Sequence, residues 1–317
     1  MSDKKISFVI PCYKSAGTIK KVTDEIISVM REDQTFEIIL VCDGSPDDTF
    51  QVIRKLCRED VRITGVEFSK NFGQHAAVMA GLKIADGDII ICMDDDGQTP
   101  ANQCQRLIDK LEEGYDAVYA SYTYKHKSFF RNFGTLMNDK MACSMLGKPK
   151  NLEVTSYFAI KRFVASEMLR YENAYPYLIG LVLRTTKNIA NVPVDHRNRE
   201  LGASGYTFSK LIGLWLNGFT SFSVKPLRIA TAGGGIFAGF GFLYGIWTVI
   251  KKIFIHPDIP VGWSAMMSFM LFIGGMLMLM LGLIGEYIGR LYISINAAPQ
   301  YVIREVVSGK KAEIEDA

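Results

Sequence analysis

The chain has 317 residues, of which 49% are hydrophobic and 22% charged, and its 36 Lys and Arg against 33 Asp and Glu give a net charge of +3. This length and composition exclude a disordered chain and suit one large domain or two ordinary ones. The small basic excess argues against a nucleic-acid-binding protein. However, residues 229–250 and 261–285 contain no Asp, Glu, Lys or Arg, so we do not expect a soluble protein.

The first part of the chain alternates predicted strands with predicted helices. The strands are Ile6–Pro11, Glu37–Asp43, Arg62–Phe68, Asp88–Asp94 and Ala117–Thr123, and the helices cover about 15–32, 47–60, 74–85 and 101–114. This order is typical of an α/β fold, a doubly wound and mostly parallel sheet. Several strands are continuous apolar runs, as expected when helices cover both faces of the sheet. Ligands of such sheets bind beyond the carboxyl ends of the strands.

Acidic residues follow two of these strands. Asp43 ends the second strand, and Asp94, Asp95 and Asp96 end the fourth. Alternation along the strand predicts Asp94 and Asp96 on one face and Asp95 on the other. Because neighbouring carboxylates repel one another, we expect a divalent metal bound by Asp94, Asp96 and Gln98, with a phosphate-bearing ligand sharing the ion. The alternative is a structural turn.

Other acidic and nucleophilic features have simpler interpretations. Asp47 and Asp48 are predicted to cap the helix that follows them. There is no Walker A sequence, no GxGxxG in the expected place and no GxSxG, which argues against an ATPase, a dinucleotide enzyme and a hydrolase. The four histidines are not paired, so a zinc site is not expected, and His75 is interpreted as a helix-start or pocket-lining residue. The six cysteines have no CxxC spacing and are expected to be reduced and buried.

The two uncharged runs are long enough to cross a bilayer as helices. They are joined by residues 251–260, so we expect a transmembrane hairpin whose flanks lie on one side of the membrane. The chain begins without a visible signal peptide, which predicts a cytosolic N-terminal domain. Ahead of the first run, residues 207–219 place apolar side chains on one helical face, which favours an interfacial helix over an ordinary core helix. That face consists of Phe208, Leu211, Ile212, Trp215, Leu216 and Phe219.

These residues together resemble a known family, the inverting family 2 glycosyltransferases of GT-A fold, and within it the polyisoprenyl-phosphate sugar synthases such as bactoprenol glucosyltransferases and dolichol-phosphate mannose synthases. The resemblance covers nearly the whole chain. The matching stretches are Val9–Tyr13 (VPxYN), Cys42–Ser45 (DDGS), Asn71–Ala77 (NFGxxAA), Met93–Pro100 (MDADLQxPP), Arg199–Tyr206 (RxxGxSxY) and 285–305 (GEYxGRxY followed by PxYxxRE). Lys14 replaces the usual Asn, and Cys42 replaces the first Asp of DDGS.

The resemblance implies roles for individual residues. Donor and acceptor substrates would be bound by Pro11, Tyr13, Asp43, Ser45, Asn71, Asp94, Asp95, Ser204, Lys125 and Arg131. Mg²⁺ or Mn²⁺ would be held by Asp94, Asp96 and Gln98, and the catalytic residues would be Asp96, Arg199 and Tyr206. Many members also have an Asp in a GDFR stretch, but the aligned run here is Thr155–Ala159, so no general base can be assigned.

A missing general base is compatible with a lipid monophosphate as acceptor, because the phosphate oxygen that would attack the sugar is already largely ionised at neutral pH. Such an acceptor needs positioning and cations to offset the two approaching phosphates. Arg199 and the basic loop from Lys125 to Arg131 are candidates, although the loop could equally be a solvated charge run.

We therefore expect four parts: a cytosolic GT-A catalytic domain over 1–205, an interfacial amphipathic helix over 206–228, the hairpin over 229–285 and a C-terminal interfacial segment over 286–317. The expected reaction is transfer of a sugar from a nucleotide sugar, preferably a UDP-sugar because of the NFG stretch, to undecaprenyl phosphate in the inner (cell) membrane. The rivals are a processive polysaccharide synthase, which would need a QxxRW motif and more spans, and a non-catalytic nucleotide-sugar-binding subunit. The identity of the sugar, a GDP donor and a homo-oligomer are left open.

Overall fold

The computed structural model describes residues 4–31, 33–122, 143, 148–195, 233–234, 236, 243, 247, 262–295 and 299–309. The chain divides into two compact units. The first comprises Met1–Leu211 together with Ala297–Ala317, and the second comprises Ile212–Asn296. Each unit is described by itself below.

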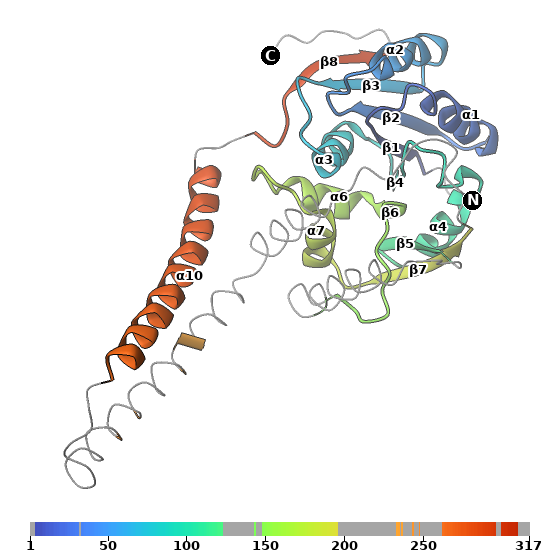
Figure 1. Ribbon diagram of the computed structural model, residues 1–317. Helices are drawn as coiled ribbons and strands as arrows, with labels where there is room; N and C mark the ends of the chain where they lie inside the picture. Colours follow the sequence, from blue (N-terminus) through green and yellow to red (C-terminus); the bar gives the residue numbers. More distant parts are fainter. Residues whose placement is uncertain are drawn as a thin grey trace. The chain divides into compact units, whose positions relative to one another are not determined.

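The first unit contains an eight-stranded mixed sheet with the order β7-β5-β6-β4-β1-β2-β3-β8, which can be followed across Figure 1. Its strands are β1 (Ile6–Cys12), β2 (Phe36–Cys42), β3 (Ile63–Phe68), β4 (Ile89–Cys92), β5 (Ala117–Tyr122), β6 (Phe158–Lys161), β7 (Ile189–Val194) and β8 (Ile303–Ser308). Strands β1 to β4 are parallel to one another, and β6 and β8 run antiparallel to their neighbours. The carboxyl ends of β1, β2 and β4 therefore meet at one edge.

Helices cover both faces of this sheet, which explains the continuous apolar strands. They are α1 (Ile19–Val29), α2 (Thr49–Glu59), α3 (Gln74–Ile84), the short 3-10 helix η1 (Ala101–Gln103), α4 (Cys104–Glu112), α6 (Arg162–Leu169) and α7 (Leu178–Thr185). One core cluster joins Phe8 and Leu40 of the sheet to apolar side chains of α1, α2 and α4. On the other face, α3 packs against β1 and β2 and is itself contacted by α6. A Cβ at Gly81 of α3 would lie 2.2 Å from Val9 Cγ1, so glycine permits this close approach.

The expected mostly parallel α/β sheet is confirmed, and its first five strands lie where the sequence predicts them. Strands β6, β7 and β8 and helices α6 and α7 were not predicted. All six cysteines are free, as expected. The prediction that they are buried is confirmed for Cys12, Cys42, Cys57, Cys92 and Cys104, but Cys143 is only half-buried.

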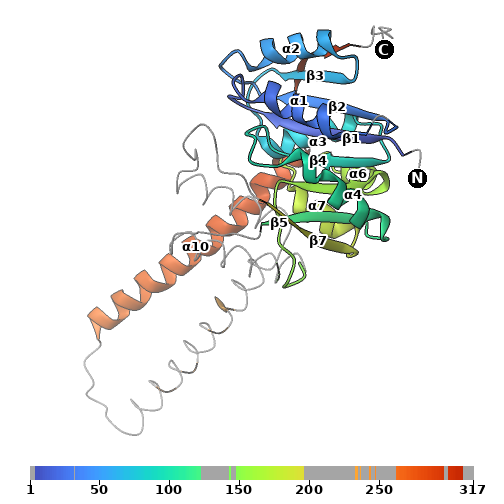
Figure 2. The same cartoon turned by 90° about the vertical axis from the view of Figure 1, so that its right-hand side faces the viewer.

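The C-terminal segment differs from the expectation. Residues 286–317 were predicted to form an interfacial segment, but Ile303–Ser308 form β8 and pair with β3. The alternating and β-branched sequence of this stretch suits an edge strand better than a membrane-surface helix. Figure 1 shows β8 beside β3 at the end of the sheet, and Figure 2 shows the sheet turned by 90°.

The second unit contains the helix α10, Trp263–Ile295, of 33 residues. Among the described residues, one stretch is long and apolar enough to cross a membrane, Phe272–Gly289, with a mean hydropathy of 1.7. The helix continues ten residues beyond the predicted end at Gly285, through Ile295.

The first predicted span, 229–250, lies almost entirely outside the described residues. Its described positions, Gly233, Gly234, Ile236, Leu243 and Trp247, are helical. A Cβ at Gly234 would lie 3.3 Å from the Sδ of Met280 in α10, so the two segments approach closely at a glycine. Small residues at a helix contact are typical of membrane helix pairs.

Candidate functional site

The carboxyl end of β2 is joined to the loop after β3 through Asp43. The buried Asp43 side chain accepts hydrogen bonds from the backbone N–H of Phe72 (2.6 Å to Oδ1) and of Gly73 (2.8 Å to Oδ2). Asn71 Nδ2 donates to the backbone oxygen of Asp43 at 3.1 Å. Burial raises the pKa of Asp43, and the two amide hydrogen bonds oppose that rise. The predicted substrate residues Asp43 and Asn71 are therefore adjacent, with Asp43 fixing the loop.

Gly44 allows the loop after β2 and the loop after β3 to approach each other closely. Its φ is +55°, in the left-handed region, and a Cβ there would lie 2.3 Å from the carbonyl carbon of Lys70. Only glycine satisfies both conditions. The match to DDGS at this position therefore has a local structural cause in addition to any role in binding.

Asp94 follows the buried strand β4 and lies at the same edge. Its Oδ1 accepts a hydrogen bond from Gln74 Nε2 at 2.9 Å, and its Oδ2 accepts one from the Ser156 hydroxyl. Burial raises the pKa of Asp94 to about 6, and the negative charges of Asp96 and Asp95 add to the rise. Ser156 and Gln74 come from distant parts of the sequence and were not predicted as site residues.

Asp95 and Asp96 contact different neighbours. Asp95 Oδ2 accepts hydrogen bonds from the backbone N–H of Tyr13 at 3.0 Å and from the hydroxyl of Ser15, in the loop after β1. Asp96 accepts hydrogen bonds from Gln98, through the backbone N–H at 3.0 Å and the side-chain Nε2 at 2.8 Å. Asp94, Asp95 and Asp96 thus have different hydrogen-bond partners, and the placement of Asp94 and Asp96 on one face stays a prediction.

The residues predicted to hold a metal fit a divalent cation. Within the described part of the chain, the donors to Asp94 and Asp95 are neutral amides, hydroxyls and backbone N–H groups, so no Lys or Arg offsets these carboxylates. The described residues contain no group of three or more His, Cys, Asp and Glu side chains arranged for a metal. Asp94, Asp96 and Gln98 stay a predicted partial ligand set of oxygen atoms, which the oxygens of a phosphate ligand could complete.

The loop after β1 forms the next part of the edge. Pro11 is buried in β1, whereas the ring of Tyr13 is 46% exposed. The backbone N–H of Lys14 donates to Ser45 Oγ at 2.8 Å, which ties this loop to the end of β2. Lys14 has a φ of +58°, a conformation that Asn tolerates better than Lys, which accounts for the Asn usual at this position of the motif.

The predicted helix caps are confirmed for one of the two residues. Asp47 Oδ1 accepts hydrogen bonds from the backbone N–H of Thr49 at 3.3 Å and from its hydroxyl at 2.6 Å. Asp48 is the residue before α2 but makes no side-chain cap hydrogen bond.

The run that replaces GDFR has structural contacts of its own. The Thr155 hydroxyl donates to the backbone oxygen of Ala120 at 2.9 Å, and the buried Tyr157 donates to the backbone oxygen of Pro100 at 3.3 Å. Ser156 donates its hydroxyl to Asp94. No carboxylate lies in this run, so the structure offers no base there.

His75 lies at the start of α3, as predicted. Its Nδ1 is 3.1 Å from the backbone oxygen of Pro176, and its ring packs at a tilt against Tyr177. Burial lowers the pKa of His75, so its neutral form is favoured. The predicted site residues Arg199, Ser204, Tyr206, Lys125 and Arg131, like the helix over 207–219, lie outside the described residues.

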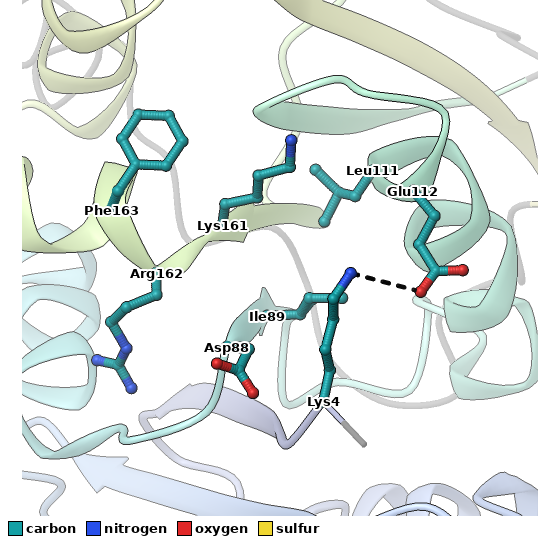
Figure 3. Close-up of a pocket in the computed structure, with 8 residues that line it drawn as sticks. All are labelled: Lys4, Asp88, Ile89, Leu111, Glu112, Lys161, Arg162 and Phe163. Atoms are coloured by element: carbon teal, nitrogen blue, oxygen red, sulfur yellow. Dashed lines mark ion pairs between the residues drawn. The ribbon is translucent and has the colours of Figure 1, made fainter. Parts of the chain in front are cut away.

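A surface pocket lies at the opposite edge of the sheet (Figure 3). Ile89 begins β4 there and Lys161 ends the antiparallel β6. It is lined by Lys4, Asp88, Ile89, Leu111, Glu112, Lys161, Arg162 and Phe163. The Arg162 guanidinium donates to the backbone oxygens of Gly87 (2.9 Å) and Ala85 (2.7 Å), which is a structural role. This pocket is therefore separate from the strand ends that carry Asp43 and Asp94.

Comparison with known families gives two matches. Residues 7–169 match the model of "Glycosyl transferase family 2", and residues 225–291 match that of the "GtrB C-terminal hairpin". The two matches together cover the sheet up to α6 and both predicted membrane spans.

Similar proteins extend over nearly the full chain. An undecaprenyl-phosphate 4-deoxy-4-formamido-L-arabinose transferase of Proteus mirabilis is 32% identical over 97% of this chain and 95% of its own length. A glycosyltransferase of Bacillus subtilis, YkcC, of uncharacterized function, is 32% identical over 94% of this chain and 93% of its own length. A crystal structure of glucosyl-3-phosphoglycerate synthase from Mycobacterium tuberculosis with uridine diphosphate has a TM-score of 0.50 and 19% identity, covering 66% of this chain and 75% of that one. This last likeness concerns the fold, which is of GT-A type.

Proposed function

The chain belongs to glycosyl transferase family 2 and carries a GtrB-type hairpin, and from this membership we propose that it transfers a sugar from a nucleotide sugar to a polyisoprenyl phosphate, with inversion at the anomeric carbon. The single observation that carries the proposal is the group of carboxylates at the carboxyl edge of the sheet. Asp94 lies close enough to Asp95 and Asp96 for their charges to raise its pKa, and its described donors are neutral. A divalent cation with a diphosphate would offset this charge.

We assign Asp94, Asp96 and Gln98 as the residues that bind Mg²⁺ or Mn²⁺. When bound, such an ion supplies Lewis-acid stabilisation of the departing diphosphate. The chain prepares the ligand set, because Gln74 and Ser156 hold the Asp94 carboxylate and the loop of Gln98 holds Asp96. The support for this assignment is the absence of a Lys or Arg donor to Asp94 among the described residues.

We assign the donor site to the loops after β1, β2 and β3. The exposed ring of Tyr13 can stack on a base, and Asp43, Ser45 and Asn71 shape the adjoining surface. UDP is the preferred nucleotide, with GDP as the alternative. The P. mirabilis relative is named for a formamido-arabinose, but the sugar of this chain is left to experiment.

The acceptor is proposed to be undecaprenyl phosphate. Ser156 already donates its hydroxyl to Asp94, and the run around it contains no carboxylate to take a proton from an alcohol acceptor. A phosphate monoester needs none, since it arrives largely ionised at neutral pH. Its oxygen can attack the anomeric carbon directly as the bond to the nucleoside diphosphate breaks. The negative charges of the acceptor phosphate and the donor diphosphate would be offset by Arg199, Lys125 and Arg131. Ser204 and Tyr206 would close over these phosphate groups.

The hairpin is proposed to hold the catalytic unit at the cytosolic face of the cell membrane. The two spans, 229–250 and 261–285, would cross the bilayer, with the 206–228 helix at its surface. The close approach of Gly234 to Met280 supports a pair of packed helices. In this arrangement the lipid tail stays in the bilayer while its phosphate reaches the site.

A second candidate function is a membrane subunit that binds a nucleotide sugar without catalysis. The loss of the GDFR carboxylate, with Tyr157 buried in its neighbourhood, favours this reading. Asp94, whose donors among the described residues are neutral, favours the enzyme.

The test is incubation of the full-length protein in lipid nanodiscs with a panel of UDP- and GDP-sugars and undecaprenyl phosphate, followed by mass spectrometry of the lipid. We expect one sugar to appear on the lipid phosphate, with nucleoside diphosphate released only when the lipid is present. Asp94→Asn and Asp96→Asn should each lower the rate about 100-fold or more, whereas Asp48→Asn, at an exposed carboxylate beside the same loops, should retain it. Nucleotide binding without any lipid product would favour the second candidate.

A further inference from the structure

The chain returns to the catalytic sheet after the membrane helix. We call Pro299–Ser308 the return segment; it begins four positions after Ile295, the last residue of α10. Its second half is β8, which pairs with β3, and the pairing extends to the loop beyond β3, where the backbone N–H of Ser69 donates to the backbone oxygen of Val302 at 2.9 Å. The return segment therefore lies directly beside the start of the NFG stretch.

An unbroken series of contacts runs from this segment to the donor site. The ring of Tyr301 stacks on Phe68, with ring centroids 5.2 Å apart and an interplanar angle of 4°. Phe68 in turn packs edge-on against Phe72 at 5.7 Å and 88°. The backbone N–H of Phe72 donates to Asp43. Tyr301 is thus connected through Phe68 to Phe72, whose backbone N–H donates to Asp43.

Polar contacts on either side of Tyr301 fix its position. Gln300 Nε2 donates to the backbone oxygen of Tyr171 at 2.5 Å, in the segment that leads to Pro176, whose backbone oxygen contacts His75. Arg304 Nη2 donates to the backbone oxygen of Ser69 at 3.2 Å. The return segment is therefore bonded both to the loop after β3 and to the loop after α6.

We propose that Tyr301 is a positioning residue for the nucleotide donor, acting through Phe68 and Phe72 on the loop that Asp43 holds. The inference rests on the proposed function, because it takes the 71–73 loop to be part of the donor site. A loop that is ordered before the ligand arrives binds it more tightly, since the entropy of ordering is not lost on binding. In this proposal Tyr301 touches neither substrate, and it contributes by keeping the 71–73 loop in its ordered conformation.

The experiment measures binding of UDP and GDP, each with Mn²⁺, by calorimetry on the full-length protein. We expect Tyr301→Ala to raise the Kd of the nucleotide that the wild type binds by about threefold to tenfold, the range expected for loss of an aromatic pair. Tyr301→Phe keeps the stacked ring and should remain within about twofold of the wild type. With the donor sugar, Tyr301→Ala should raise KM and leave kcat at saturation nearly unchanged.

A matched control separates positioning from general stability. Arg54→Gln removes the ion pair between Arg54 of α2 and Glu305 of β8. Glu305 belongs to the same return segment but lies away from the NFG stretch, so this variant should leave the Kd unchanged. Hydrogen exchange of the amides of 69–75 in the nucleotide-free protein should be faster in Tyr301→Ala and unchanged in Arg54→Gln. If Tyr301→Ala does not fold, Tyr301→Leu, which keeps apolar bulk without the stacked ring, takes its place.

Two results would overturn the inference: a Kd for Tyr301→Ala equal to that of the wild type, or an equal rise in Kd for Arg54→Gln. Both leave the proposed function intact, because the wild type still binds nucleotide. A wild type that binds neither UDP nor GDP would refute the proposed function, and the inference with it.

Discussion

Asp43→Asn tests whether the Asp43 carboxylate holds the loop after β3 against the end of β2. In the native protein its two oxygens accept the backbone N–H groups of Phe72 and Gly73 at 2.6 and 2.8 Å. Asparagine has nearly the same shape but keeps only one acceptor. Its NH₂ group would face one of the two amide N–H groups, so two donors would oppose each other in a buried place.

The magnitude follows from the number of bonds lost. One charge-assisted hydrogen bond is worth about 1.5–3 kcal/mol, and the remaining bond weakens because the acceptor is no longer charged. We therefore expect the free energy of unfolding of the catalytic unit to fall by about 2–3 kcal/mol. For a unit of this size, that loss corresponds to a decrease in Tm of about 4–12 °C.

Thermal unfolding of the full-length protein in detergent, with hydrogen exchange of the 71–73 amides, provides the assay. The exchange of Phe72 and Gly73 should accelerate more than that of β1, because their own acceptor is changed. Asp48→Asn serves as the control, since Asp48 is exposed and makes no side-chain cap hydrogen bond. A Tm of Asp43→Asn within about 1 °C of the wild type, with unchanged exchange at 71–73, would refute the reasoning.

Two further predictions concern neighbouring residues. Lys14→Asn should stabilise the protein by about 0.5–1 kcal/mol, because Lys14 has a φ of +58° and Asn tolerates that conformation better. Thermal unfolding measures this effect, and a lower Tm for the variant would contradict it. Burial lowers the pKa of His75 below its ordinary value of 6.5, so below that pH the unfolded chain takes up a proton more readily than the folded one. The stability that neutral His75 contributes should therefore be fully present above pH 6.5 and be lost as the pH falls. His75→Gln should flatten the dependence of Tm on pH between about 7.5 and 5. An equal slope in both proteins would exclude His75 as its source.

Much of the catalytic sheet could be predicted from sequence because its first half is locally regular. Strands β1 to β4 are short apolar runs separated by helices of ordinary length, and their amphipathic or Ala-rich patterns are visible within windows of about a dozen residues. Even α3, which is buried from Ala76 to Leu82, was found by its place between two strands.

The missed elements depend on partners far away in the sequence. Strand β6 has only four residues, Phe158–Lys161, and gains its structure by pairing with β4 and β5. Strand β8 pairs with β3 across more than 230 residues, with the predicted hairpin in between. Its alternating, β-branched sequence suits an edge strand, but the partner strand is too distant for a local pattern to reveal, which is why the C-terminal segment was predicted wrongly as interfacial.

The candidate site was predictable in position but not in detail. Acidic residues at the ends of parallel strands must share one edge, so Asp43 and Asp94 could be brought together from the strand order alone. The partners Gln74 and Ser156 could not, because each reaches Asp94 from another element. The direction of Asp43, toward backbone amides of the next loop, is likewise a tertiary contact without a sequence pattern.

The hydrogen bonds indicate that the carboxylates at the carboxyl ends of the strands have different roles. Asp43 and Asp95 accept backbone N–H groups of other loops, from Phe72, Gly73 and Tyr13, and so connect the loops after β1, β2, β3 and β4. A backbone N–H cannot move away from its acceptor unless its whole loop moves, so Asp43 and Asp95 have a structural role. Within the part of the chain that the structure describes, Asp94 has only side-chain donors, which can rotate away when a cation arrives. If the proposed function is right, replacing Asp43 should therefore disturb the fold and donor binding together, whereas replacing Asp94 should abolish transfer in a protein that still folds.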